Sequence, residues 1–452
     1  MAAHKDFRWL SVEITYGLYL SDHSILDEVD TELVVLSGIM IQNLKTETGW
    51  HLRGTRRIGV TQDEVEIIQQ CIEKVAAFCG LQLTKVPRVA DIEHELYTHH
   101  PSIQIPTSPS QPQSQWTISA KNGLDGLQLN HNIPVPSLGL KDCLVKIAAV
   151  SLNYRDIAIP TGKYPLYWNS TIVPTSDGAG TIVAVGEAVT LLRIGDKVCT
   201  LFTQAHQTGF FRHEMRETTL GSAVDGPLRE WAVYPEQGLV GAPRSLGLVE
   251  AATLPCAAVT AWNALKGLEG RKVGRGDVVL CQGTGVHWLV ALQFAIAAGA
   301  TAIATTSSAR KEAILKDLGA HHVVNYNTDT NWGETAKALA GGEGVSHVIE
   351  VGGESTMAQS LKAVRPEGVI AQIGFVGGMG RSEVGFARAC AIVRSVMVGS
   401  KALFEEMNAF IDKHGIKPVV DERVFGFEEA RQAYDRMVEQ NFVGKIVIRV
   451  SS

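Results

Sequence analysis

The segment DVVLCQGTGVHWLVALQFAIAAGA spans residues 277–300 and joins a short apolar run to a longer one through two glycines. Its first part is strand-like and VALQFAIAAGA (290–300) is helical. TAIATT (301–306) and ARKEAILKDLGA (309–320) repeat this order, and HHVVNY (321–326), HVIEV (347–351) and GVIAQIGF (368–375) follow as short apolar strands. Strands alternating with helices predict an α/β domain with a doubly wound parallel sheet over about 243–400.

Three further parts surround this domain. Residues 1–97 form a helical segment in which Thr61 and Glu64 are spaced as a capping box and Gly80 is placed to end the helix. Residues 98–115 are rich in Pro, Ser and Gln and are expected to be a linker. Residues 116–242 are strand-rich, with glycines between the strands. Residues 401–452 add helices and a last strand, KIVIRV, and we assign them to the domain of residues 116–242.

Composition excludes several classes of protein. Hydrophobic residues make up 45% of the 452 residues and charged residues 19%, as in a soluble enzyme. The net charge of -6 argues against a nucleic-acid partner, because phosphate binding needs a basic face. Apolar stretches are too short to span a membrane, and the N-terminus lacks an apolar run. The seven cysteines have no CxxC spacing, so we expect a cytoplasmic protein.

The glycine-containing turn after the first strand of a parallel sheet is where a dinucleotide pyrophosphate binds. A complete fingerprint places glycine at three positions, for the tight turn, for close approach of the phosphates and for helix–strand packing. Gly283 and Gly285, on either side of Thr284, satisfy the first two positions, and Trp288 occupies the third. The turn therefore predicts a dinucleotide site with one altered position.

The end of the next strand indicates which dinucleotide is preferred. NAD-binding sites place Asp or Glu there to hold the ribose hydroxyls, whereas a phosphorylated ribose needs hydroxyls and cations. This chain has Ser307, Ser308, Arg310 and Lys311 and no acid. The pattern favours NADPH over NADH. The alternative is that Ser308 only caps the following helix while Arg310 and Lys311 are solvated, and both can hold together.

Six short motifs carry a family resemblance. They are SLNYRD (151–156), VPTSDGAG (173–180), EAATLPCAAVTAWNAL (250–265), GVSHVIEVGG (344–353), IGFVGG (373–378) and NFVGKIVI (441–448). In this order they resemble the medium-chain dehydrogenases/reductases, in the zinc-independent, quinone-reductase-like branch. The resemblance covers residues 113–452 and implies a β-rich GroES-like catalytic domain and a Rossmann cofactor-binding domain.

The resemblance implies metal-free hydride transfer, because the Cys, His and Glu ligands of zinc-dependent members are absent from 151–156 and 176–180. Four closely spaced cysteines of the second zinc site are also absent; His206 and His213 are expected to be ordinary surface histidines. The implied substrate is small and apolar or aromatic. Aromatic residues that could line its pocket, or could equally serve packing, are Tyr164, Tyr167, Trp168, Phe210 and Phe211.

Residue roles follow from the same resemblance. Asn153, Tyr154 and Asp156 would line the cleft beside the nicotinamide, and Tyr154 is the candidate proton donor, with structural packing as its alternative. The remaining residues implied to contact the cofactor are Thr260, Lys311, Tyr326, Val351, Gly352, Phe375, Asn441 and Lys445. Of these, Lys311 and Tyr326 would flank the ribose phosphate, and Asn441 and Lys445 would close the nicotinamide end.

The chain departs from this subfamily where the turn has Val286, His287 and Trp288 in place of small residues. Two hypotheses remain open. In the first the turn shifts slightly, NADPH still binds, and the enzyme reduces an activated double bond, a quinone or a carbonyl. In the second the dinucleotide site is spoiled, and the cleft hosts an isomerisation, cyclisation or decarboxylation that uses His287 and Tyr154. A binding-only protein is a third reading.

The upstream segment has its own resemblance. QNLKTETGWHLRGTRRIGVT (42–61) and KVPRVADIEH (85–94) resemble the carboxymuconolactone decarboxylases, which are small, helical and oligomeric. Glu47 and His51 are four residues apart and would share one helix face, as an acid–base pair or as a structural ion pair. The segment is shorter than a complete family domain and lacks the CxxC of redox-active members. We expect a homo-oligomer, and such a fusion fits a role in secondary metabolism.

Overall fold

The computed structural model of the protein describes residues 28–57, 60–92, 112–119, 123–164, 169–283, 286–374 and 389–451. The chain divides into two units, residues 1–104 and residues 105–452. No helix in the described ranges is both long and apolar enough to cross a bilayer.

Six parallel strands form one sheet of the larger unit, in the order β11-β10-β9-β12-β13-β14. The strands are β9 (Val278–Cys281), β10 (Thr301–Thr306), β11 (His322–Asn325), β12 (Val345–Glu350), β13 (Val364–Gln372) and β14 (Ile392–Ser395). Strand order reverses between β9 and β12, which is the switch point where such sheets bind ligands. The predicted α/β class with a doubly wound parallel sheet is confirmed.

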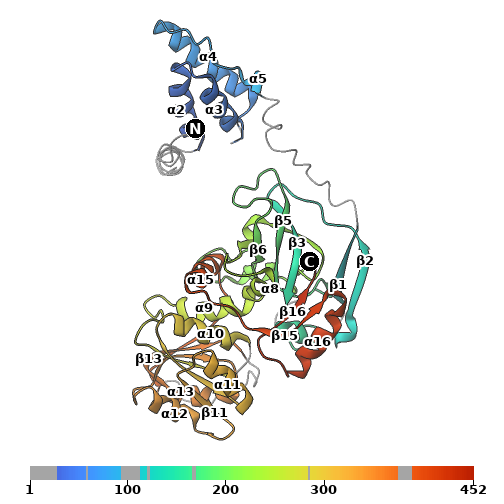
Figure 1. The fold of residues 1–452 in the computed structure, drawn as a ribbon, viewed down its shortest axis with the longest axis vertical. Helices are drawn as coiled ribbons and strands as arrows, with labels where there is room; N and C mark the ends of the chain where they lie inside the picture. Colours follow the sequence, from blue (N-terminus) through green and yellow to red (C-terminus); the bar gives the residue numbers. More distant parts are fainter. Residues whose placement is uncertain are drawn as a thin grey trace. The chain divides into compact units, whose positions relative to one another are not determined.

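Helices connect these strands and surround the sheet, as Figure 1 shows. They are α10 (Val286–Ala297), α11 (Ala309–Asp317), α12 (Trp332–Leu339) and α13 (Glu354–Ala363). Every residue of β12 is buried. A central parallel strand is covered on both faces. Its residues are therefore nearly all apolar, whereas a strand with one exposed face alternates apolar and polar residues. That is why short apolar runs identify this sheet in the sequence.

The β-rich part of the same unit has a second sheet, in the order β15-β16-β3-β5-β6-β8, with β7 paired to β3. Its strands are β3 (Asp142–Ser151), β5 (Asp177–Val185), β6 (Lys197–Thr200), β7 (Trp231–Pro235), β8 (Leu239–Gly241), β15 (Val420–Gly426) and β16 (Lys445–Arg449). A smaller sheet has the order β2-β1-β4, from β1 (Gln113–Ser119), β2 (Leu127–Ile133) and β4 (Thr171–Ile172). The C-terminal strand β16 pairs antiparallel with β3, so residues after 400 return to the β-rich part.

Helices α9 (Val259–Lys266) and α15 (Lys401–His414) pack where the two parts meet. The indole of Trp262 on α9 lies 5.3 Å from the ring of Phe294 on α10 and 4.9 Å from that of Phe410 on α15. These rings belong to the largest apolar core, which therefore ties the three helices together. Helix α15 begins at a Ser400 cap and ends at Gly415, whose φ of 62° suits glycine.

The remaining helical elements are short. They are α7 (Tyr154–Ala158), α8 (Leu248–Ala251), α16 (Ala430–Glu439), η2 (Gly123–Gly126), η3 (His213–Thr218), η4 (Glu236–Gly238), η5 (Leu254–Ala258) and η6 (Phe427–Glu429).

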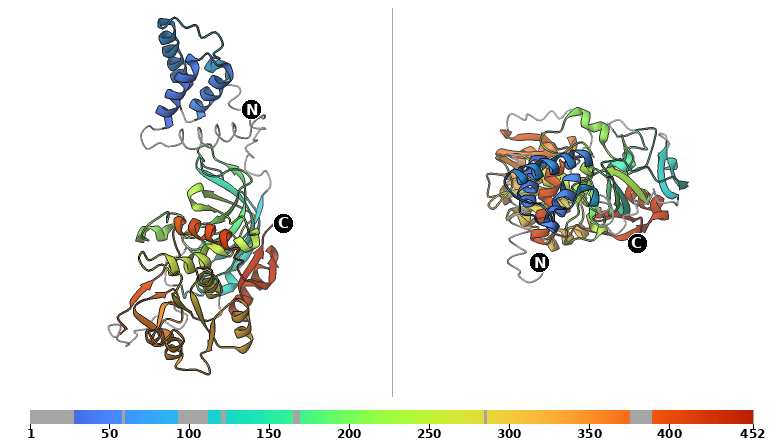
Figure 2. Two further views of the ribbon diagram at one scale, coloured as in Figure 1. Left: turned by 60° about the vertical axis from the view of Figure 1, so that its left-hand side comes forward. Right: turned by 90° about the horizontal axis from the view of Figure 1, so that it is seen from above.

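The smaller unit is a helical bundle, shown in blue in Figure 2. Its helices are α2 (Glu28–Ile41), α3 (Lys45–Arg57), α4 (Gln62–Phe78) and α5 (Val89–Ile92). A small apolar core of Leu36, Met40, Leu52, Val65, Ile72 and Val89 holds them together. The Thr61–Glu64 capping box is confirmed, because the Thr61 hydroxyl accepts from the Glu64 N–H and Glu64 accepts from the Thr61 N–H.

Two local expectations were wrong. The end of the predicted linker, Gln113 to Gln115, belongs to strand β1. The Gln113 Oε1 accepts from the Trp231 N–H at 2.9 Å and the Gln115 Oε1 accepts from Arg229, so both buried amide oxygens are bonded to residues distant in the sequence. Ser308 stands at the N-cap position of α11, but its side chain makes no capping hydrogen bond.

Replacement of Gly180 by alanine is expected to destabilise the larger unit. A Cβ at this position of β5 would lie 2.2 Å from the Lys146 carbonyl oxygen on β3. Forcing atoms into a packed sheet costs about 1–3 kcal/mol, so the free energy of unfolding in urea should fall by at least that amount. Gly241→Ala is the matched control, because a Cβ on β8 would meet nothing within 4 Å. Equal stability of the two variants would contradict this packing.

Candidate functional site

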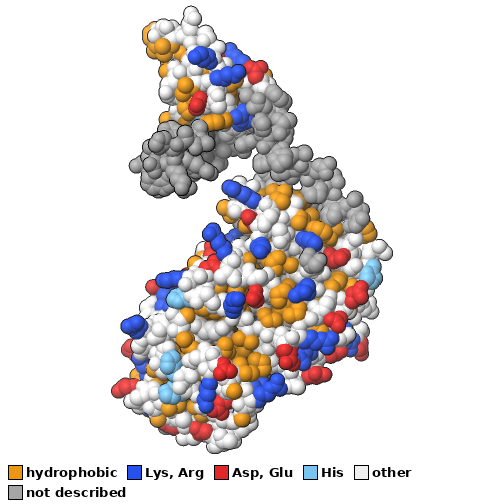
Figure 3. Space-filling model, in the orientation of Figure 1, with side chains coloured by type: hydrophobic (Ala, Val, Ile, Leu, Met, Phe, Trp, Pro, Cys, Tyr) orange, Lys and Arg blue, Asp and Glu red, His pale blue; other side chains and the backbone are white. Residues whose placement is uncertain are grey.

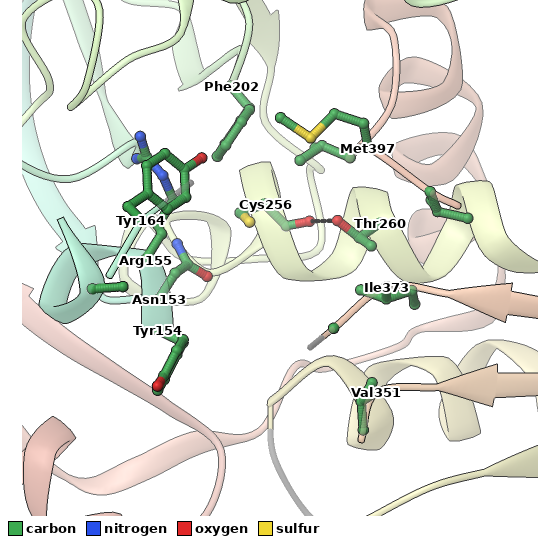
Figure 4. A pocket seen from close by; sticks show the side chains of 14 residues that line it. Asn153, Tyr154, Arg155, Tyr164, Phe202, Cys256, Thr260, Val351, Ile373 and Met397 are labelled. Atoms are coloured by element: carbon green, nitrogen blue, oxygen red, sulfur yellow. Dashed lines mark hydrogen bonds between the residues drawn. The ribbon is translucent and has the colours of Figure 1, made fainter. Parts of the chain in front are cut away.

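A pocket of about 190 Å³ lies at the carboxyl ends of the parallel strands, between the two parts of the larger unit. The β-rich part contributes Asn153, Tyr154, Arg155, Ala158, Tyr164 and Phe202; the other lining residues are Cys256, Thr260, Val351, Ile373, Gly374, Val396, Met397 and Val398. Figure 4 shows Arg155, Tyr164 and Phe202 gathered on one side and Val351 and Ile373 across from them. Most of these side chains are apolar, as in sites for small organic ligands.

The short helix α7 brings the SLNYRD motif to this pocket. The Asp156 carboxylate accepts from the Asn153 N–H at 2.8 Å, which caps the first turn. Asn153 and Tyr154 line the pocket as expected, and Tyr154 keeps 41% of its surface exposed. In Figure 4 its ring is directed away from Arg155. Asp156, which was expected to line the cleft, is buried behind it and is not part of the pocket wall.

A buried ion pair lies directly behind Asn153. The Lys445 ammonium donates to Asn153 Oδ1 at 2.7 Å and to Asp177 Oδ2 at 3.1 Å. Lys445 is only 1% exposed, and the hydroxyl of Ser176 donates to the other Asp177 oxygen at 2.7 Å. The sequence placed Lys445 at the nicotinamide end; its ammonium is buried behind Asn153, a residue of the pocket wall, so that role stays a prediction. Asn441, expected beside it, is exposed.

The Asn153 side chain has one hydrogen-bonding group without a partner. Its Oδ1 accepts from Lys445, and its Nδ2 is buried without a hydrogen-bond partner. A buried donor without an acceptor costs free energy, so such a group at a pocket wall is suited to a ligand oxygen.

Arg155 is a functional candidate that the sequence analysis did not single out. It is 7% exposed, its Nη1 donates to the Leu220 carbonyl at 2.9 Å, and its guanidinium lies over the rings of Tyr164 and Phe202 at 5.3 and 5.0 Å. Burial acts to lower the pKa of Arg155, but Tyr164 and then Asp156 outweigh it and raise this pKa. The side chain is therefore a permanent cation in the pocket wall.

The predicted pyrophosphate turn lies at the carboxyl end of β9. Gly283 has a φ of 79° and its N–H donates to the Thr305 hydroxyl at 3.0 Å. A left-handed φ explains the need for glycine there. Thr284 and Gly285 lie outside the described residues, and so does Phe375. Of Val286, His287 and Trp288 only the helical backbone is described, so the roles assigned to the His287 and Trp288 side chains stay predictions.

The end of β10 carries the predicted phosphate-binding side chains. Ser307, Ser308 and Lys311 are partly exposed and Arg310 is exposed, all at the start of α11. Tyr326 follows the neighbouring strand β11, keeps 39% of its surface exposed, and its N–H donates to the Thr306 carbonyl at 3.0 Å. These residues therefore lie at one corner of the sheet, where their hydroxyl and cationic groups could bind an anion.

Thr260, Val351 and Gly352 were also predicted to contact the cofactor. Thr260 and Val351 line the pocket, and the Thr260 hydroxyl donates to the Cys256 carbonyl at 2.6 Å. Gly352 lies beside Val351, and a Cβ there would meet the Thr356 side chain at 2.3 Å. The turn after β12 is therefore kept free of side-chain bulk.

Among the predicted aromatic lining residues, Tyr164 is in the pocket wall. Phe210 is exposed, and Phe211 packs edge-on against His206, with ring centroids 5.5 Å apart. Tyr167 and Trp168 lie outside the described residues. The expectation of a surface His206 was wrong, since its ring is buried and its Nε2 lies 3.1 Å from the Gly209 carbonyl; His213 is exposed.

In the smaller unit, Glu47 and His51 both lie on α3. His51 is buried and Glu47 is partly exposed, so the predicted pair stands at the edge of the bundle core. The acid–base and the structural readings both remain predictions.

The described residues contain no group of three or more His, Cys, Asp or Glu side chains placed to hold a metal ion. On the face that Figure 3 shows, basic and acidic side chains are interspersed over the larger unit.

Comparisons with known proteins agree on one family. Residues 139–244 match the alcohol dehydrogenase GroES-like domain, and residues 289–413 match the zinc-binding dehydrogenase domain. A zinc-type alcohol dehydrogenase-like protein of Schizosaccharomyces pombe is 42% identical over 339 residues, which are 73% of this chain and 96% of the relative. An NADPH-dependent alkenal/one oxidoreductase of Arabidopsis thaliana is 26% identical over 341 residues, 74% of this chain and 78% of that protein.

A solved structure described as an alcohol dehydrogenase of Sinorhizobium meliloti superposes with a TM-score of 0.70 and 36% identity. It covers 75% of this chain and 99% of that one. The similarity therefore spans nearly the whole of that structure.

The buried Asp156 predicts an unusual dependence of stability on pH. Burial raises its pKa to about 6, against the lowering effects of Arg155, the Asn153 N–H and Lys445, while Asp177 adds to the increase. The folded state therefore binds this proton more tightly than the unfolded state, and the stability that the proton confers is lost as pH rises from about 4 through 6.

Asp156→Asn should remove this dependence. The wild-type free energy of unfolding, relative to the variant, should fall by about 3 kcal/mol between pH 4 and 7, as a shift of about two pKa units implies. Urea unfolding across that range measures it, with the surface variant Asp435→Asn as control. Parallel curves for wild type and Asp156→Asn would contradict the assignment.

Proposed function

Because this chain belongs to the medium-chain dehydrogenase/reductase family, we propose that it is a zinc-independent, NADPH-dependent reductase of activated double bonds, quinones or carbonyls. The family supports an oxidoreductase with a nicotinamide cofactor. The observation that carries the proposal is the apolar pocket at the carboxyl ends of β12 to β14, with Asn153, Tyr154 and Arg155 in its wall. The Arabidopsis relative, an alkenal/one oxidoreductase, supports the substrate class.

The residues present fit the cofactor. Gly283 provides a left-handed turn after β9, and a Cβ at Gly352, in the turn after β12, would collide with the Thr356 side chain. Ser307, Arg310 and Lys311 follow β10, and no acidic residue stands at the end of that strand, so they fit a phosphate on the ribose. Thr260 and Val351 would hold the nicotinamide end, because both lie in the pocket wall. When bound, the reduced nicotinamide supplies a hydride to a carbon of the substrate.

The protein's own groups would orient the substrate and move a proton. The unpartnered Asn153 Nδ2 can donate to a carbonyl oxygen of the substrate, and this polarises the conjugated double bond. The phenol of Tyr154, partly exposed at the same wall, can deliver the second hydrogen as a proton and recover it from solvent. The apolar side chains of Phe202, Ile373 and Met397 would exclude water from the reacting carbon.

A positively charged side chain lies between the SLNYRD and VPTSDGAG motifs, and this supports zinc independence. The Lys445 ammonium lies between Asn153 and Asp177 and is bonded to both. A second cation beside it would meet like-charge repulsion in a buried site.

We assign the smaller unit, which resembles the carboxymuconolactone decarboxylases, to assembly of a homo-oligomer. Ile67, Val75 and Phe78 lie along one face of α4 and are 59%, 55% and 93% exposed. Such an apolar stripe is suited to contact with another protein surface. If Glu47 and His51 instead act on a substrate, His51→Ala would abolish turnover while the assembly persists.

The cofactor preference is tested by Arg310→Ala/Lys311→Ala. We expect wild type to bind NADPH at micromolar concentration and to oxidise it with a conjugated enone. The double variant should raise KM for NADPH about tenfold or more and leave KM for NADH nearly unchanged, because it removes charged hydrogen bonds to the ribose phosphate. Steady-state kinetics with both cofactors measures the difference.

The matched control is Lys316→Ala, a lysine of the same helix that pairs with Glu312. Equal losses with NADPH and NADH would refute the phosphate role. A wild-type protein that binds neither cofactor would refute the reductase and favour the non-redox hypothesis built on His287 and Tyr154.

A further inference from the structure

Arg155 has hydrogen-bonding groups that the fold leaves unused. Its Nη1 donates to the Leu220 carbonyl, but its buried Nε and Nη2 have no hydrogen-bond partner. Asp156 lies 3.7 Å from Nη1, which is too long for a hydrogen bond, and it does not reach the other two nitrogens. A guanidinium that is 7% exposed with free N–H groups lacks an acceptor that a ligand can supply.

A ligand bound in the pocket could supply the hydrogen-bond acceptor that Arg155 lacks. Among the described residues that line it, Arg155 is the only one with a formal charge, and no carboxylate faces the cavity. The rings of Tyr164 and Phe202 pack against the guanidinium, and Figure 4 shows all three on the same side of the pocket. The apolar lining excludes water that would otherwise compete for the N–H groups, which strengthens a charged contact.

The geometry of a guanidinium selects the acceptor. Nε and one terminal nitrogen form a fork whose two parallel N–H groups match the two oxygens of a carboxylate. These are the two nitrogens without partners here, since Nη1 is occupied by Leu220. A neutral carbonyl offers both N–H groups only one oxygen and no negative charge, so it complements the guanidinium less well.

We propose that Arg155 binds a carboxylate of the substrate, so that the enzyme acts on small unsaturated compounds that carry an acid group besides the activated double bond. This inference rests on the proposed reductase function and names its substrate class. Asn153, on the same pocket wall, then receives the conjugated carbonyl, and the carboxylate fixes which end of the molecule enters first.

The test compares two compounds with the same enone, (E)-4-oxopent-2-enoate and its methyl ester, with NADPH as reductant. The wild-type KM for the acid should be about tenfold to a hundredfold lower than for the ester, as a charged bidentate contact implies. Arg155→Gln should raise KM for the acid more than KM for the ester, by about that factor, so that the preference for the acid is lost, and Arg155→Lys should recover part of the preference. KM for NADPH should stay the same in both variants.

Arg229→Gln is the matched control. Arg229 is also a buried arginine of the β-rich part, but it bonds Gln115 and Asp225 and does not line the pocket. It should leave the ratio of acid to ester unchanged. Thermal unfolding of each variant identifies any loss of folding, and Arg155→Lys keeps the test decisive if Arg155→Gln is unstable.

A binding measurement separates this inference from the proposed function. Calorimetric titration with the saturated compounds, 4-oxopentanoate and its methyl ester, needs no turnover. Tighter binding of the acid that is lost in Arg155→Gln supports the carboxylate site even if NADPH is never oxidised. Equal affinities for acid and ester, or a loss of NADPH affinity in Arg155→Gln as large as the loss for the acid, would overturn it.

Discussion

The architecture of the site depends on one buried cation, the Lys445 ammonium. It reaches Asn153 and Asp177, which precede it by 292 and 268 residues, and bonds both. Two charges removed from water are tolerated only when each is paired and its remaining groups are bonded. The Ser176 hydroxyl and the Asn153 amide complete this requirement. The last strand is thereby fixed beside β3, and the start of α7 is held at the pocket.

That placement has a consequence for the chemistry. Asn153 cannot turn away from Lys445 without leaving a buried ammonium under-bonded, so its Nδ2 stays in the pocket wall. One residue later the chain enters α7, which sets Tyr154 and Arg155 on the same wall. In the proposed function, the β-rich part would position the substrate, and the turns after β9, β10 and β12 would position the nucleotide. A bound substrate would then lie between these two parts.

Much of the fold could be predicted because its signals are local. The strands of the parallel sheet are buried on both faces, so they are short apolar runs, and the Thr61–Glu64 capping box is set by a three-residue spacing. The first residues of strand β1, Gln113 to Gln115, could not be predicted from their Gln- and Ser-rich sequence, because the amide oxygens of the two glutamines are bonded by residues more than a hundred positions away. For the same reason the sequence did not single out Arg155, whose partners Leu220 and Phe202 lie far away in the chain.

The claim that the Lys445–Asp177 pair organises this part of the molecule is tested most directly by a double-mutant cycle in the free energy of unfolding, with Lys445→Met and Asp177→Leu. Each single variant leaves an unpaired buried charge and should cost about 3–5 kcal/mol. The double variant leaves none and should be more stable than the sum of the two losses predicts by at least about 2 kcal/mol. Strictly additive losses would contradict the account.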